Sequence, residues 1–258
     1  MKMKRSEKLG MFTGLVVGVL LLLISVFMIF QTTCKVWGAE KPANATQQGI
    51  DVSSHQGKID WEQVKNSALA DYAIIRCGYG VNQTDKDDKY WDYNSSECER
   101  LGIPYGTYLY SGADTTAKAK SEAEHVVRLL QGKNLTYPIY YDMEADMLNQ
   151  LSSTQIGNIA KTFLNTMESY GYKNVAVYSN KYLFETKLTA SVFSDYPKWI
   201  AQHSNKCTYR GSYHMWQYST QGVIPGISEK VDLNYKIGNW TYAGYSSAKK
   251  TVVVKPKA

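Results

Sequence analysis

The fold of this chain is decided by the stretch Tyr137-Pro138-Ile139-Tyr140-Tyr141-Asp142-Met143-Glu144-Ala145-Asp146. Its apolar, aromatic-rich run after Pro138 predicts a buried strand. Successive side chains of a strand alternate between faces, so Asp142 and Glu144 should point the same way, with α-carbons about 6–7 Å apart. Two carboxyl groups that converge on one bond can share acid and base roles. An isolated Asp-x-Glu pair is weak evidence, however, because a merely polar strand end has the same pattern.

Upstream of this stretch, strand patterns alternate with helix patterns. Asp60 is suited to cap a helix that begins at Trp61, because its side-chain oxygen can accept from a free amide of the first turn. Gly102 should end a second helix that begins near Tyr90. Further helices are expected over residues 115–130 and 153–170. Besides the quoted stretch, the predicted strands are residues 49–53, 72–76, 103–110 and 174–179.

Three short strand-like runs follow, with little helix between them. They are Lys198-Trp199-Ile200-Ala201, Met215-Trp216-Gln217-Tyr218 and Val231-Asp232-Leu233. About eight strands, the first five separated by helices, predict a parallel sheet closed into an irregular, TIM-like (β/α) barrel with reduced helices in its second half. A chain of 258 residues fits one such domain of about 200 residues plus appendages. We place the barrel at residues 48–242.

The acidic residues of this α/β barrel fall where its chemistry should be. Catalytic groups of such barrels gather at the carboxyl ends of the strands. Asp51 ends the first predicted strand, Asp142 and Glu144 end the fourth, and Asp232 lies in the last. Several strands should therefore deliver carboxyl groups to one face. This convergence strengthens the functional interpretation of the Asp-x-Glu pair.

Four short motifs, in register, resemble those of the glycoside hydrolase family 25 lysozymes over about residues 48–242. They are Asp51-Val52-Ser53-x-x-Gln56-Gly57, Tyr141-Asp142-Met143-Glu144, Trp216-Gln217-Tyr218 and Val231-Asp232-Leu233-Asn234. The resemblance implies an irregular (β/α) barrel that hydrolyses the β-1,4 bond between N-acetylmuramic acid and N-acetylglucosamine in peptidoglycan. It also implies that Glu144 is the general acid and Asp142 its partner, with Asp51 and Asp232 lining the cleft. No cofactor and no metal are expected.

The expected chemistry needs one carboxylic acid that keeps its proton near neutral pH. Glu144 is the natural choice, because the neighbouring Asp142 and Asp51 resist full ionisation of the set. Ionised Asp142 could attack the anomeric carbon, or it could orient the substrate's own N-acetyl group to do so. Because the Asp-x-Glu arrangement, with both acids on one strand, resembles that of enzymes that use the substrate's N-acetyl group, we favour participation of that group, with retention of configuration.

Aromatic residues are abundant, with 21 Tyr and 6 Trp. Their rings suit a cleft that stacks on sugars, although core packing explains any single one equally well. Trp216 and Tyr218 are the better candidates because they fall within a matched motif. The candidate substrate-binding residues are Asp51, Tyr79, Tyr108, Trp216, Gln217, Tyr218 and Asp232.

The amino-terminal segment predicts export. Four basic residues within the first eight precede an uncharged run over residues 11–30, which is long enough to span a bilayer. We favour an uncleaved anchor over a signal peptide cleaved near Gly38-Ala39. Either way the barrel would be extracytoplasmic. We divide the rest of the chain into a basic stub and membrane segment over 1–32, a linker over 33–47 and a basic, disordered tail over 243–258.

Charge and cysteine content limit the possible partners. The net charge is +6, but five of the 29 basic and two of the 23 acidic residues lie within the first 40, which leaves +3 for the remainder. No basic run indicates a nucleic-acid partner. The expected partners are peptidoglycan glycan strands and, through the amino-terminal segment, the membrane, and we expect a monomer. Export permits one disulfide among Cys77, Cys98 and Cys207, but the sequence does not select the pair.

Two other functions fit parts of the pattern. A barrel could bind peptidoglycan without cutting it, as part of an envelope complex. A metal-dependent wall-glycan deacetylase would need two or three histidines at ligand spacing, and the four present show no such spacing.

Overall fold

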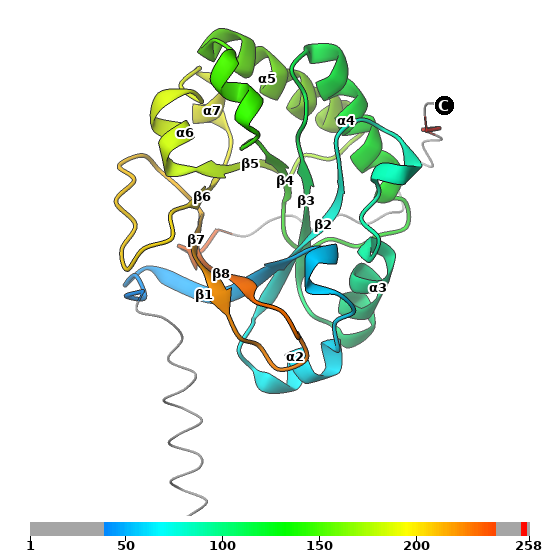
Figure 1. The fold of residues 1–258 in the computed structure, drawn as a ribbon, viewed down its shortest axis with the longest axis vertical. Coiled ribbons are helices and arrows are strands. Elements are labelled where there is room, and N and C mark those ends of the chain that lie inside the picture. Colours follow the sequence, from blue (N-terminus) through cyan, green and yellow to red (C-terminus); the bar gives the residue numbers. More distant parts are fainter. Residues whose placement is uncertain (1–38, 241–253, 257–258) are drawn as a thin grey trace, which may run out of the picture. The chain divides into compact units, whose positions relative to one another are not determined.

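The computed structural model describes residues 39–240 and 254–256, which form one closed barrel with its flanking helices (Figure 1). The predicted membrane segment, its cleavage site and most of the predicted basic tail lie outside these residues. Within the described ranges, no helix is long and apolar enough to cross a membrane.

Eight strands pair in chain order around the barrel, from β1 to β8 and back to β1. Strands β1 to β7 run parallel to one another, and β8 runs antiparallel to both of its neighbours, β7 and β1. The eight-stranded α/β barrel predicted from the sequence is therefore confirmed. The strands are β1 (Ala45–Val52), β2 (Tyr72–Tyr79), β3 (Tyr105–Tyr110), β4 (Ile139–Asp142), β5 (Val175–Asn180), β6 (Lys198–Ala201), β7 (Met215–Gly222) and β8 (Val231–Ile237).

The direction of β8 corrects the expectation of a fully parallel sheet. Only residues 223–230 join β7 to β8, with no helix among them, and a parallel crossover needs a dozen residues or more. The chain therefore turns back as a hairpin. As a result the start of β8 lies beside the end of β1, with Asp232 directly opposite Asp51. Because of this reversal, Asp232 lies at the face of the barrel where the other strands have their carboxyl ends.

Helices surround the strands, and they become short in the second half, as predicted (Figure 1). Asp60 caps α2, with the backbone N–H of Gln63 donating to its Oδ1 at 3.1 Å. Gly102 follows α3 with a positive φ of 67°, a conformation that glycine adopts without strain. The helices are α2 (Trp61–Ser67), α3 (Trp91–Leu101), α4 (Thr116–Leu129), α5 (Ser153–Ser169), α6 (Lys181–Thr186) and α7 (Val192–Asp195), with short 3-10 turns η1 (Ser54–Gln56), η2 (Thr84–Lys86) and η3 (Asp146–Gln150).

Aromatic rings fill the interior of the barrel. Tyr72 stacks on Tyr137 with ring centroids 4.4 Å apart. Trp199 packs against Tyr140 at 4.9 Å and against Tyr178 at 4.4 Å. These five side chains belong to one buried cluster. Much of the high tyrosine content therefore serves core packing rather than an open sugar-binding surface.

Candidate active site

A small cavity of about 70 Å³ opens at the carboxyl ends of the strands. All four acids that the sequence singled out line it, and they come from β1, from the end of β4 and from β8. Tyr108 and Gln217 also line it, as do Tyr178 and Trp199, which are not among the candidate binding residues given above. The complete lining is Asp51, Tyr108, Asp142, Glu144, Tyr178, Trp199, Gln217 and Asp232.

Asp51 is held by side-chain amides. Asn234 Nδ2 donates to Asp51 Oδ2 at 2.6 Å, and Trp199 Nε1 fixes that amide by donating to Asn234 Oδ1 at 2.8 Å. Gln217 Nε2 lies 3.2 and 3.1 Å from the two oxygens of Asp51 and 3.2 Å from Asp232 Oδ2. Both oxygens of Asp51 are thus engaged by protein donors. This carboxyl group is suited to organising the site rather than to reacting.

The orientation of Gln217 depends on two donors behind it. The hydroxyl of Tyr178 donates to Gln217 Oε1 at 3.0 Å, and His203 Nε2 lies 2.9 Å from the same oxygen. Because a carbonyl oxygen only accepts, His203 must carry hydrogen on Nε2. The amide nitrogen of Gln217 is thereby turned toward the carboxyl groups. Sequence reasoning missed His203, which lies in the segment between β6 and β7 and belongs to no motif.

Asp142 and Glu144 project into the cavity, while Met143 between them is buried on the other side. Backbone hydrogen bonds join this segment to the residue after β3 and to β5. Ser111 N–H donates to Asp142 O, and Met143 N–H donates to Tyr178 O, each at 2.9 Å. Asp142 is 3% exposed, and none of the residues that the structure describes forms a hydrogen bond with its Oδ1. Glu144 is only partly buried. A substrate therefore reaches Glu144 first and finds an unused acceptor on Asp142.

The pKa of all four carboxyl groups is raised, and neighbouring carboxylates add to the effect on Asp51, Asp142 and Asp232. Burial is the main cause for all of them, and it raises the pKa of Asp51, Asp142 and Glu144 above their ordinary values. The charge of Glu144 adds to the effect on Asp142 and on Asp232, whose pKa rises to about 6. Arg76 partly offsets the shift of Asp142. The cluster therefore retains protons closer to neutral pH than isolated carboxyl groups would.

Three of the aromatic candidates lie away from this cavity. Tyr79 is 41% exposed, and its hydroxyl donates to Asp85 O at 3.4 Å. Trp216 and Tyr218 flank Gln217 on β7 and so face the opposite side of the sheet. Trp216 Nε1 donates to Gln202 O at 2.9 Å, and Tyr218 stacks on Tyr235 at 4.4 Å. A role of these three residues in substrate binding stays a prediction.

No described cysteine lines this cavity. Cys77 and Cys98 are buried free thiols, and Cys207 is a partly exposed one. Within residues 39–240 and 254–256, no three His, Cys, Asp or Glu side chains are arranged to hold a metal ion.

An α/β barrel with a cluster of carboxyl groups at the carboxyl ends of its strands, two of them on one strand, defines a glycoside hydrolase site. The family model described as "Glycosyl hydrolases family 25" matches residues 50–227. The chain therefore belongs to this family and is a glycoside hydrolase, in agreement with the resemblance of its motifs, three of which lie within the matched residues.

Known relatives include lysozymes and autolysins. The autolytic lysozyme of Clostridium acetobutylicum is 30% identical over 188 residues, 72% of this chain and 55% of that protein. The modular autolysin LytC from Streptococcus pneumoniae, solved with a synthetic peptidoglycan ligand, is 33% identical with a TM-score of 0.66, over 73% of this chain and 46% of that one. The chain thus spans about half the length of these two proteins. A family 25 glycosyl hydrolase from Bacillus anthracis shares the fold at a TM-score of 0.68 and 21% identity, with 79% and 94% covered.

Proposed function

We propose that this barrel is a muramidase, which hydrolyses the β-1,4 bond between N-acetylmuramic acid and N-acetylglucosamine in peptidoglycan. One observation carries the proposal: Asp142 and Glu144 enter the same cavity from one strand end, with Asp51 and Asp232 beside them. The lysozyme and autolysin relatives support the choice of substrate. An intact acid cluster favours cleavage over binding alone.

Glu144 is the proton donor in this proposal. It is the more accessible member of the Asp-x-Glu pair, and burial raises its pKa. The two groups titrate as a coupled pair, so a proton held by Glu144 removes the charge that opposes ionisation of Asp142. Arg76 also favours the ionised form of Asp142. The pair can therefore share one proton, and the more accessible Glu144 is the member that can pass it to the substrate.

The unused Oδ1 of Asp142 suits an N–H donor, which the acetamido group of the substrate supplies. In the first step Glu144 protonates the glycosidic oxygen, the bond to the anomeric carbon breaks, and the acetamido oxygen bonds to that carbon. Asp142 meanwhile accepts the N–H hydrogen bond of the cyclic intermediate. Water then attacks the anomeric carbon, gives its proton to Glu144 and reopens the ring. Two inversions leave the configuration retained.

Digestion of purified peptidoglycan by the full chain, with mass spectrometry of the fragments, tests the activity. We expect muramic acid at each new reducing end. The Glu144→Gln variant should keep binding to the wall and lose release of reducing sugar by roughly a hundredfold or more. Glucosamine at the new ends, or equal release by both proteins, would contradict the proposal.

The mechanism has its own test, which leaves the activity proposal intact if it fails. Glycan substrates without the acetamido group should be cleaved poorly, and no sugar ester on Asp142 should accumulate under rapid quenching. A trapped ester on Asp142, or efficient cleavage without the acetamido group, would favour direct attack by Asp142.

We also propose that the chain acts outside the cytoplasm as a monomer held to the membrane through residues 11–30. The basic residues before this uncharged run support that orientation. Cell fractionation should find the full-length chain in the membrane fraction, sensitive to protease added from outside. Release of a shortened chain that begins near Ala39 would indicate a cleaved signal instead. Light scattering of the detergent-solubilised chain tests the monomer.

A further inference from the structure

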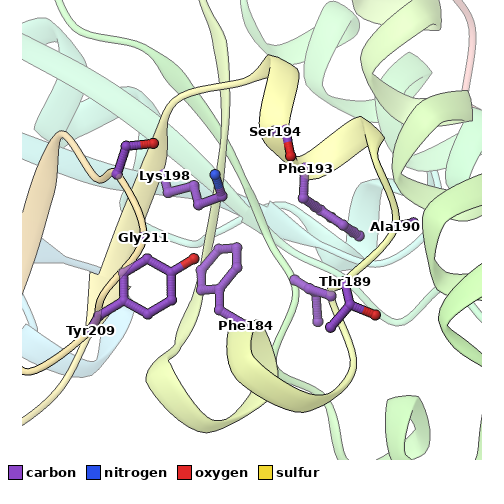
Figure 2. Close-up of a pocket in the computed structure, with 10 residues that line it drawn as sticks. Phe184, Thr189, Ala190, Phe193, Ser194, Lys198, Tyr209 and Gly211 are labelled. Carbon is purple, nitrogen blue, oxygen red and sulfur yellow. The ribbon is translucent and has the colours of Figure 1, made fainter.

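A second cavity, of about 340 Å³, lies outside the barrel beside β6 (Figure 2). Its walls come from α6, from α7 and from the segment that joins β6 to β7. Three rings, those of Phe184, Phe193 and Tyr209, form much of its lining. This volume is within the range of small-molecule sites.

Lys198, the first residue of β6, supplies the only charged group of this lining. Side chains alternate along a strand, so Lys198 points away from Trp199, which faces the barrel interior and lines the catalytic cavity. The sheet therefore separates the two cavities. Figure 2 shows the ammonium group of Lys198 among the rings of Phe184, Phe193 and Tyr209.

The ammonium group of Lys198 lacks a partner. The residue is only 8% exposed, and the structure of residues 39–240 and 254–256 gives its Nζ neither a hydrogen bond nor an ion pair within 4.0 Å. Two titratable groups interact with it over longer distances. Asp195 partly offsets the lowering of the pKa of Lys198 by burial, and Lys198 in turn lowers the pKa of His214.

Two other shielded cations among the described residues are paired. Arg76 Nε lies 2.8 Å from Asp88 Oδ2, and Lys236 Nζ lies 3.1 Å from Gln47 Oε1. Burial lowers the pKa of Lys198, and proteins compensate the cost of a shielded ammonium group with an anion or a hydrogen-bond acceptor. The described chain supplies none to Lys198. A ligand that enters the cavity can supply such an anion or acceptor.

We propose that this cavity binds the carboxylate of a small ligand that also carries a short apolar group. The carboxylate would pair with Lys198 Nζ, and the apolar group would lie against Phe184 and Phe193. Phosphate fits less well, because a doubly charged anion calls for an arginine fork or several N–H donors, and the lining offers one lysine. The carboxyl end of a peptide and a free short-chain acid share the required chemistry.

Titration calorimetry on the full chain tests the proposal with four probes. N-acetylalanine represents the carboxyl end of a peptide, propionate represents a free acid, N-acetylalanine amide removes the charge at nearly constant shape, and inorganic phosphate tests a general anion site. We expect N-acetylalanine to bind at one site and its amide at least tenfold more weakly. Tighter binding of propionate than of N-acetylalanine would assign the site to free acids.

Two variants locate the binding. Lys198→Met keeps the length of the side chain, removes its charge and should weaken N-acetylalanine binding at least tenfold without lowering the melting temperature. Lys206→Met removes an exposed lysine from the segment between β6 and β7 and should change neither. Peptidoglycan cleavage should stay unchanged in both. Equal binding of acid and amide, equal binding by Lys198→Met and the unchanged chain, binding of phosphate alone, or no binding of any probe would overturn the proposal.

Discussion

A buried carboxyl group lies on each side of strand β4, and the two differ in their hydrogen bonds. Tyr141 contacts one of them, that of Glu122, and the neighbouring Asp142 carries the other. Outside the barrel, Tyr141 OH donates at 2.6 Å to Oε2 of Glu122, a fully buried residue of α4. Ser111 Oγ donates to the same oxygen at 2.9 Å, and Gly112 N–H donates to Oε1 at 2.8 Å. Inside the barrel, the next residue, Asp142, keeps an oxygen that no group in the described part of the chain contacts through a hydrogen bond.

Burial raises the pKa of both carboxyl groups, so burial alone does not distinguish them. The difference lies in the donors. Protein groups engage both oxygens of Glu122, and its hydrogen bonds join α4 to the barrel. Asp142 instead presents an unused acceptor to a cavity that opens toward substrate. A satisfied buried carboxyl group stabilises the fold, whereas an unsatisfied one marks the reactive site.

Among the variants that test this contrast, Asp142→Asn should have the largest effect on cleavage. The amide has the shape of the carboxyl group but cannot carry its charge, so cleavage should fall roughly a hundred- to a thousandfold. The melting temperature should stay the same or rise, because no donor loses its partner. Release of reducing sugar and thermal unfolding measure the two effects. Activity within threefold of the unchanged chain would contradict the assignment.

Glu122→Gln should have the reverse consequence. One acceptor oxygen becomes an NH₂ group that faces N–H or O–H donors, which should cost about 1–3 kcal/mol of unfolding free energy. Cleavage per folded molecule should change little. Glu124→Gln on the same helix is the control, because Glu124 makes only a long ion pair of 4.0 Å with Lys120. Similar denaturation midpoints for the two variants would refute the structural role of Glu122.

Asp232→Asn tests the electrostatics of the cluster through pH. Folding raises the pKa of Asp232 from 3.8 to about 6, so the folded state is favoured while the group is protonated and loses stability as pH rises through about 6. At pH 7 this loss is on the order of 3 kcal/mol. The variant should therefore be more stable than the unchanged chain at pH 7, and the difference should vanish near pH 4. Denaturant titrations at both values measure it.

His203→Ala should have the smallest effect. Tyr178 still donates to Gln217 Oε1 after the imidazole is removed, so the amide should keep its direction, and kcat should fall about fivefold, the equivalent of one hydrogen bond. Charged His203 also lowers the pKa of Glu144, so the alkaline limb of the pH profile should move to higher pH in the variant. His55→Ala, at an exposed residue, is the control. An unmoved limb would show that His203 has only a structural role.

The sequence predicted the elements whose cause is local. Asp60 and Gly102 mark helix ends by their own chemistry, and the Asp142–Glu144 spacing turns both acids into one cavity from the end of β4 and the residues just after it. The direction of β8 needed a further step, because it follows from the length of residues 223–230 rather than from any pattern within the strand. Asp232 was nevertheless assigned to the correct face.

The remaining errors and omissions have a common physical source. Membership of the Trp216-Gln217-Tyr218 motif gave no indication of which residue faces the cavity, and the structure places only Gln217 there. His203 reaches Gln217 from a segment without regular secondary structure. The partnerless ammonium of Lys198 is visible only when every neighbouring element is in place. Each depends on tertiary contacts between residues distant in sequence.

The reversal of β8 also governs how the barrel can be attached to anything else. Because β8 ends opposite the start of β1, with Ala45 paired to Ile237 and Gly238 N–H donating to Asn44 O at 2.8 Å, the chain enters and leaves the barrel on the side remote from the acids. Any segment joined before β1 or after β8 is therefore attached at the end of the barrel opposite the carboxyl groups.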